Sequence, residues 1–77
     1  MLSTDYFQNK VLLKRPYLKN EWIEYVLQNP AKVEIQAEDN RIRYWAFIKE
    51  IGKYLRVVTL TDGITVHNAF PDRDFTI

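Results

Sequence analysis

The chain has 77 residues, of which 47% are hydrophobic and 27% are charged, and it contains no cysteine. This length and composition predict one folded domain with a single core and exclude a disordered chain. Without cysteines there is no disulfide, and His67 is the only histidine, so no Cys/His set for structural zinc exists. The net charge of +1 argues against a generally basic nucleic-acid-binding protein. Any such function must therefore depend on where the charges lie.

The amino terminus lacks both the basic start and the apolar run of a signal peptide. The longest apolar run, Tyr44 to Ile48, is far shorter than the roughly 20 residues that cross a membrane. We therefore expect a cytoplasmic protein with no membrane partner. A core of this size leaves only about 3–5 kcal/mol of net stability. A partner chain or self-association is the expected source of any additional stability.

Two short amphipathic helices are predicted in the first third of the chain. Ser3 or Thr4 can cap a helix over about 4–15, which ends before Pro16. Asn20 can cap a second helix over about 20–29, which Pro30 closes. The apolar residues that share one side of these helices are Phe7, Val11, Trp22, Ile23, Val26 and Leu27.

The remaining chain predicts four strands, over about 32–37, 41–50, 54–60 and 64–70. Turns are expected at Asp39-Asn40, at Ile51-Gly52 and at Asp62-Gly63, the last with the pattern of a type I′ hairpin. The predicted fold class is α+β. Both helices pack on one face of a four-stranded antiparallel meander in the order α-α-β-β-β-β.

Two-residue turns also fix the register, which sorts the strand residues into two faces. In that register Tyr44 lies opposite Ile35 in the first hairpin and Trp45 opposite Val58 in the second. In the third hairpin Val58 lies opposite His67. One face is apolar and receives the helices, and it includes Phe70, with Asn68 also expected to point to the core. The opposite face is expected to carry Glu34, Gln36, Arg41, Arg43, Trp45, Phe47, Lys49, Tyr54, Arg56, Thr65 and His67.

Basic and aromatic side chains alternate on this second face, a combination that suits single-stranded RNA. Cations bind phosphates and rings stack on bases. Cleavage of RNA by its own 2′-hydroxyl needs a base, an acid and a positive charge on the developing phosphorane. His67 is the candidate for proton transfer, with Glu34 a more distant one. Arg56, helped by Arg43 or Lys49, is the candidate for the charge.

Each of these residues also has a purely structural interpretation. His67 can be a tolerated polar residue on an exposed strand, and Trp45 and Phe47 can form a homodimer or partner interface. Arg41 and Arg43 can pair with Glu34, Glu38 or Asp39 across the first hairpin. Arg73 lies in a charged tail and can fold back over the sheet. No carboxylate or histidine cluster suggests a metal, and no cofactor is expected.

The order of elements resembles the RelE/ParE/BrnT group of bacterial toxins. Several segments are also similar to a related uncharacterised family of small domains that accompany toxin–antitoxin genes. They are KRPYLKNEWIEYVLQNP, RIRYWAFI, GKYLRVVTL, and ITVHNAF with Asp72-Arg73 behind it.

The resemblance implies a metal-independent endoribonuclease that cuts messenger RNA at the ribosome and is silenced by a cognate antitoxin. It implies working residues on the open sheet face, and the matching positions are Arg43, Lys49, Tyr54, Arg56 and His67. The chain departs from the group in its low net charge and in having only Arg73 as a basic residue near the carboxyl terminus. ParE-like relatives bind a protein target instead, so a binding module for RNA or protein remains the alternative.

Overall fold

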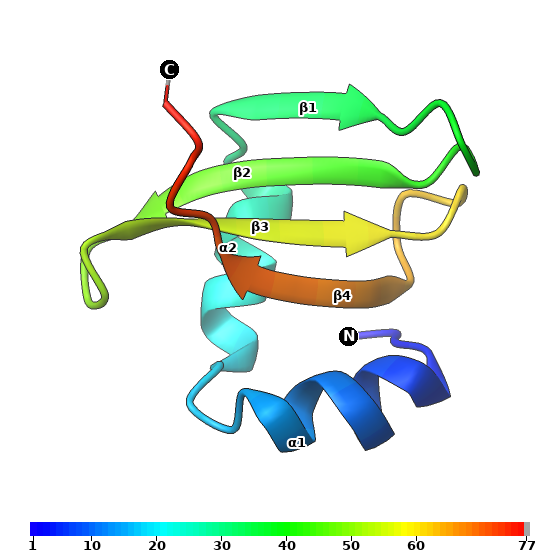
Figure 1. Ribbon diagram of the computed structural model, residues 1–77, viewed down its shortest axis with the longest axis horizontal. Helices are drawn as coiled ribbons and strands as arrows, with labels where there is room; N and C mark the ends of the chain where they lie inside the picture. Colours follow the sequence, from blue (N-terminus) through cyan, green and yellow to red (C-terminus); the bar gives the residue numbers. More distant parts are fainter. Residues whose placement is uncertain (77) are drawn as a thin grey trace.

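The computed structural model describes residues 1–76 and confirms the predicted α+β architecture (Figure 1). Two helical segments precede a four-stranded antiparallel sheet with the order β1-β2-β3-β4, so each strand pairs with its neighbour in sequence. The strands are β1 (Lys32–Ile35), β2 (Ile42–Ile48), β3 (Lys53–Thr59) and β4 (Val66–Pro71).

The first helix contains a π-helical segment, η1 (Phe7–Val11), which continues into α1 (Leu12–Lys14). The backbone N–H of Phe7 donates a hydrogen bond of 3.1 Å to Thr4 Oγ1, so the predicted side-chain cap at Thr4 is confirmed. The second helix, α2 (Asn20–Gln28), has Lys19 at its N-cap, so the cap predicted at Asn20 is wrong by one residue.

The core lies between the helices and one face of the sheet. In Figure 1, α2 lies behind the strands and α1 runs below β4. Phe7 and Val11 from the first helix and Ile23 and Val26 from α2 are at most 2% exposed. They pack in one cluster with strand residues on alternate positions, which are Ala46, Ile48, Leu55, Val57, Val66 and Ala69.

The two edges of the sheet differ. Ser3 forms a parallel bridge to Val66, with Thr4 N–H donating to Val66 O and Val66 N–H donating to Leu2 O, each at 2.9 Å. The start of the chain therefore covers the β4 edge. All four residues of β1 are exposed, so β1 is the open edge.

The third strand connection keeps the predicted register, but Asp62 does not have a positive φ and Gly63 N–H donates to Leu60 O, so the predicted type I′ turn is wrong. The first two strand connections are longer than the predicted two-residue turns. Gln36 N–H donates to Arg41 O across the first hairpin, and Gly52 N–H donates to Ile48 O in the second. As a result Tyr44 pairs with Val33 instead of Ile35, and Trp45 pairs with Arg56 instead of Val58. Both shifts are of two residues. Because side chains alternate with period two, the predicted division into faces holds for these strands.

A β-bulge at His67 changes the face of the residues after it. Thr59 pairs with Val66, in the predicted register, but Val58 pairs with Asn68, so His67 is the additional residue. Ala69 therefore lies in the core beside Val57. The prediction that Phe70 and Asn68 face the core is wrong, because an inserted residue reverses the alternation.

We expect Ile23→Ala to lower the free energy of unfolding by about 2–5 kcal/mol, because it removes a buried side chain and leaves a cavity. Leu13→Ala, at a position that is 76% exposed, should change it by less than about 0.5 kcal/mol. Urea unfolding followed by circular dichroism measures both. Equal effects would contradict the described core.

Candidate functional site

The face of the sheet opposite α2 is called the outer face. Its strand residues follow from the observed register and are Lys32, Glu34, Arg43, Trp45, Phe47, Tyr54, Arg56, Val58, Asn68 and Phe70. The residues that the sequence singled out are spread along the strands. They form a group at the His67 end, a group in the middle around Arg56, and a group at the far end of β2.

Residues 72–76, called the tail, cross the outer face after β4. In Figure 1 the tail (red) passes in front of β3 and β2, on the opposite side of the sheet from α2. Asp72 N–H donates to Tyr54 O at 2.8 Å, which continues the pairing with β3 by one residue. Asp72 Oδ1 accepts the N–H of Asp74 at 3.1 Å, and this side-chain turn reverses the chain beyond Asp72.

The other carboxylate oxygen of Asp72 lies at the centre of the middle group. Asp72 Oδ2 accepts hydrogen bonds from Trp45 Nε1 at 2.9 Å, from Arg56 Nε at 3.2 Å and from Arg56 Nη2 at 3.0 Å. The side chains of Arg56 and Asp72 are 24% and 9% exposed. Burial raises the pKa of Asp72, but the hydrogen bonds from Trp45 and Arg56 outweigh burial and hold the pKa below 3.8.

Aromatic rings complete this group. Phe75 of the tail stacks on Trp45 with centroids 4.8 Å apart and planes 12° apart. The Phe75 and Tyr54 rings form a T-shaped pair with centroids 4.9 Å apart. The Arg56 guanidinium lies 4.8 Å from the centroid of Phe70 and 5.3 Å from that of Trp45. Trp45 is only 4% exposed. The expected exposed ring at Trp45, for stacking or for a dimer interface, is therefore covered by the chain's own tail.

His67 is held in place at the other end of the outer face. Its Nδ1 lies 3.0 Å from Thr4 Oγ1, and its ring stacks on Tyr6 with a centroid distance of 4.8 Å. A hydroxyl can donate to or accept from Nδ1, so this contact fits either neutral tautomer. Burial lowers the pKa of His67, the charge of Arg41 lowers it further, and Asp39 opposes both; the pKa lies below 6.5. His67 is therefore mostly neutral at pH 7.

A chain of polar contacts links the basic residues of this end. Arg43 donates to Gln36 Oε1 at 2.8 Å and to Glu34 Oε1 at 3.1 Å, and Gln36 donates to Asp39 Oδ1 at 3.0 Å. Arg41 forms an ion pair with Asp39 at 3.5 Å. The pairing of both arginines with acidic residues across the first hairpin, which the sequence left as an alternative, is confirmed. These partly exposed pairs stabilise the fold only weakly and leave the arginines free to exchange partners.

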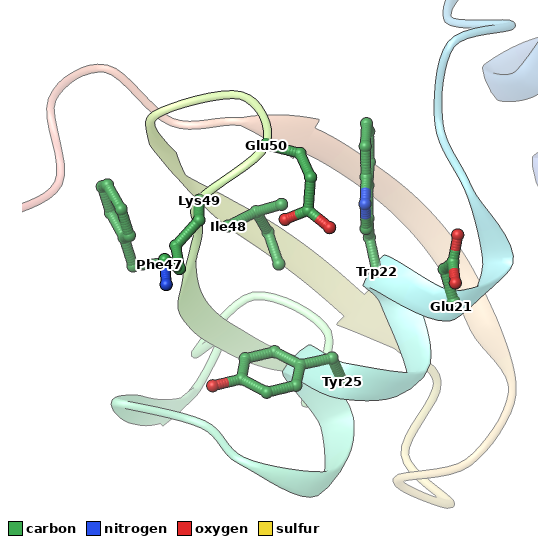
Figure 2. A pocket seen from close by; sticks show the side chains of 7 residues that line it. All are labelled: Glu21, Trp22, Tyr25, Phe47, Ile48, Lys49 and Glu50. Carbon is green, nitrogen blue, oxygen red and sulfur yellow. The ribbon is translucent and has the colours of Figure 1, made fainter.

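The third group lies at the opposite end of β2. Lys49 follows Ile48, whereas His67 lies beside Thr59, the partner of Ile42, so the strand separates them by roughly 20 Å. Lys49 and Phe47 line a separate groove of about 320 Å³ next to α2 (Figure 2). The other residues of the groove are Glu21, Trp22, Tyr25, Ile48 and Glu50. Arg73 is exposed in the tail. Lys49 therefore does not share a site with His67.

Sequence reasoning missed the partners that organise the outer face. Asp72 was expected to be part of a charged tail, and Phe75, Thr4 and Tyr6 were assigned no role in a site. Their contacts span 16 to 63 residues of sequence, so no local periodicity indicates them. The proline before Asp72 is the one local signal, because it marks the end of the strand.

Comparisons with protein-family models, with curated protein sequences and with solved structures gave no match. Within residues 1–76, no three or more His, Asp or Glu side chains lie close enough together to hold a metal ion. Over the same part of the chain, no helix has the length and apolar character needed to span a membrane.

We expect the pKa of His67, measured by NMR titration of the only imidazole, to lie below 6.5 and to rise in Arg41→Gln. The substitution removes a positive charge that disfavours the imidazolium. Lys14→Gln, on the helix, is the control and should leave the titration unchanged. A pKa that falls or stays constant in Arg41→Gln would contradict this electrostatic environment.

We expect Asp72→Asn to lower the free energy of unfolding at pH 7 by about 1.5–3 kcal/mol, because charged hydrogen bonds to Trp45 and Arg56 are lost. The folded-state pKa of Asp72 is depressed, so its contribution is complete above about 3.8 and is lost as the pH falls through the folded value. Urea unfolding over a pH series should therefore show the two proteins converging in acid. Asp5→Asn is the exposed control, and a constant difference at all pH values would argue against the ion pair.

Proposed function

We propose that the outer face binds single-stranded RNA and that the protein is a metal-independent endoribonuclease of the toxin type. The observation that supports this proposal is the environment of His67. Burial and the charge of Arg41 lower the pKa of His67, which favours the neutral imidazole. Thr4 and Tyr6 hold the ring in place, and it lies at the same end of the sheet as Arg41 and Arg43.

In the proposed reaction the ribose 2′-oxygen attacks the adjacent phosphorus, and the bond from phosphorus to the 5′-oxygen breaks. With its proton on Nδ1, donated to Thr4 Oγ1, His67 can accept the 2′-hydroxyl proton at Nε2. Arg43 and Arg41 would exchange their acidic partners for the phosphate and stabilise the charge of the phosphorane. The leaving 5′-oxygen takes its proton from solvent water, and Glu34, once released from Arg43, is the second candidate for accepting the 2′-hydroxyl proton.

The middle of the outer face would bind RNA without taking part in proton transfer. Arg56 and Trp45 offer a cation and a ring, and Tyr54 offers a second ring. A cognate antitoxin would silence the activity by covering this face, and the ribosome would present the messenger RNA in the cytoplasm. These partners belong to the proposal and follow from the resemblance to the toxin group.

One observation favours a second candidate, a module that binds RNA or a partner protein without cleaving it. Asp72 neutralises Arg56, and Lys49 lies at the far end of the sheet. Of the cations that the sequence suggested for catalysis, Arg56 is thus already paired with a carboxylate and Lys49 lies far from His67. A homodimer through the half-exposed Phe47 belongs to this second candidate.

Induced expression of the protein in a bacterial host distinguishes the ribonuclease from the non-catalytic binding module. We expect the wild type to arrest growth with cleaved messenger RNA, and His67→Ala to slow cleavage by about 10²–10⁴-fold, the contribution of a positioned general base. Arg43→Gln should also reduce cleavage, whereas Lys14→Gln on the helix should behave as the wild type.

The rate of cleavage by purified protein should rise with pH through the pKa of His67, because the base must be unprotonated. If messenger RNA stays intact although the wild-type protein is folded, the ribonuclease function is excluded and the binding module remains as the candidate function. Binding of labelled RNA to the same preparation, lost in Arg43→Gln, would then support that second candidate.

A further inference from the structure

We propose that Trp45 and Arg56 form a nucleotide-binding subsite of the outer face, and that Asp72 and Phe75 of the tail occupy it in the free protein. The inference rests on the proposed RNA-binding function and adds to it the position of one phosphate and one base. It follows from the chemical likeness between the tail and a nucleotide, an anion followed by a stacked planar ring.

The anionic part is Asp72 Oδ2. Three N–H donors converge on this single oxygen, one from Trp45 and two from Arg56, at 2.9 to 3.2 Å. A non-bridging phosphate oxygen carries the same charge and accepts the same hydrogen bonds, and guanidinium groups bind carboxylates and phosphates in the same way. The three donors therefore define a site for one phosphate oxygen.

The planar part is Phe75. Its ring lies nearly parallel to the Trp45 indole, at 12° and 4.8 Å between centroids, which is the arrangement of a base stacked on an aromatic side chain. The Tyr54 ring lies beside Phe75 in a T-shaped arrangement, with centroids 4.9 Å apart, and forms a wall of the subsite. A base placed on Trp45 would meet the same wall, so the subsite takes one planar base of any kind.

The tail is attached in a way that allows exchange. Asp72 itself is held by the sheet, through its N–H to Tyr54 O. Beyond Asp72 the described contacts are the turn between Asp74 N–H and Asp72 Oδ1 and the stacking of Phe75. Phe75 can therefore leave Trp45 by a movement of the last few residues while the four strands stay paired.

The consequence is a competition that lowers the apparent affinity for RNA. Ligand binds only the fraction of molecules in which the subsite is open, so a variant that opens the tail binds RNA more tightly without any new contact. When a phosphate replaces the Asp72 carboxylate on Arg56, while Asp72 N–H stays bonded to Tyr54 O, the positive charge of Arg56 becomes available on the outer face. The tail thus hides part of the basic character of a chain whose net charge is only +1.

The first test measures binding of a short fluorescently labelled oligouridylate by anisotropy. We expect Phe75→Ala to tighten binding about fivefold, within the contribution of one stacked base, and the exposed tail control Thr76→Ala to match the wild type. Adding Trp45→Ala to Phe75→Ala should abolish the gain, because the base then has no ring to stack on.

The second test isolates the phosphate position. Asp72→Asn keeps the shape of the side chain but removes its charge, so Arg56 can bind an RNA phosphate instead. The slope of the logarithm of affinity against the logarithm of salt concentration should steepen by about 0.7, the value for one additional phosphate contact with a single strand. Asp74→Asn removes a charge from the same tail and should leave the slope nearly unchanged.

The outcomes separate this inference from the function on which it rests. If the wild type binds the oligouridylate but Phe75→Ala and Asp72→Asn, both folded by circular dichroism, bind it identically, the tail does not occupy the subsite. If no variant binds RNA, the proposed function fails and the subsite with it. Equal gains in Thr76→Ala and Phe75→Ala would also overturn the inference, because stacking on Trp45 would not be their cause.

Discussion

The outer face depends on one carboxylate oxygen, Asp72 Oδ2. It accepts hydrogen bonds from Trp45 and Arg56 where both side chains are largely buried, and a buried donor without an acceptor would destabilise the fold. The same residue also sets the direction of the tail, because its second oxygen, Oδ1, accepts the N–H of Asp74. With the tail in this position Phe75 covers Trp45. One acidic residue after the last strand therefore holds the tail over a sheet face that is rich in rings and cations.

The His67 end depends on a different local feature, the bulge in β4. Val66 is bound on both sides, to Thr59 in β3 and to Ser3 at the start of the chain, and the extra residue falls directly after it. Thr4, in the bridging segment, reaches His67 with the same hydroxyl that caps the first helix. Thr4 thus joins the helix start and His67 through its hydroxyl, and the sheet edge through its backbone N–H. A neutral, oriented imidazole near arginines is suited to proton transfer on RNA, and this is the basis of the proposed function.

Much of the fold could be predicted from local patterns. Period-two alternation identified the faces of β1, β2 and β3, and the error of two residues in their register left those faces intact. The bulge could not be predicted, since nothing in ITVHNAF distinguishes an inserted residue, and this placed Phe70 and Asn68 on the wrong face. The site was predicted as a set of residue types but not as an arrangement. Lys49 lies far from His67 along the strand. Trp45 is covered because Asp72 and Phe75 bind across the sheet, through contacts that sequence spacing does not encode.

In the proposed exchange Trp45 is the ring on which RNA replaces Phe75, and its indole N–H is a direct reporter. The most direct measurement is a two-dimensional ¹H–¹⁵N NMR titration of the labelled protein with a short single-stranded oligouridylate. The two indole signals are assigned with Trp22→Phe and Trp45→Phe. We expect the Trp45 indole signal to move on binding, together with the backbone signals of residues 72–76, while the Trp22 indole in the core stays in place. Binding that shifts the Trp22 indole and leaves Trp45 and the tail unchanged would contradict the proposed exchange.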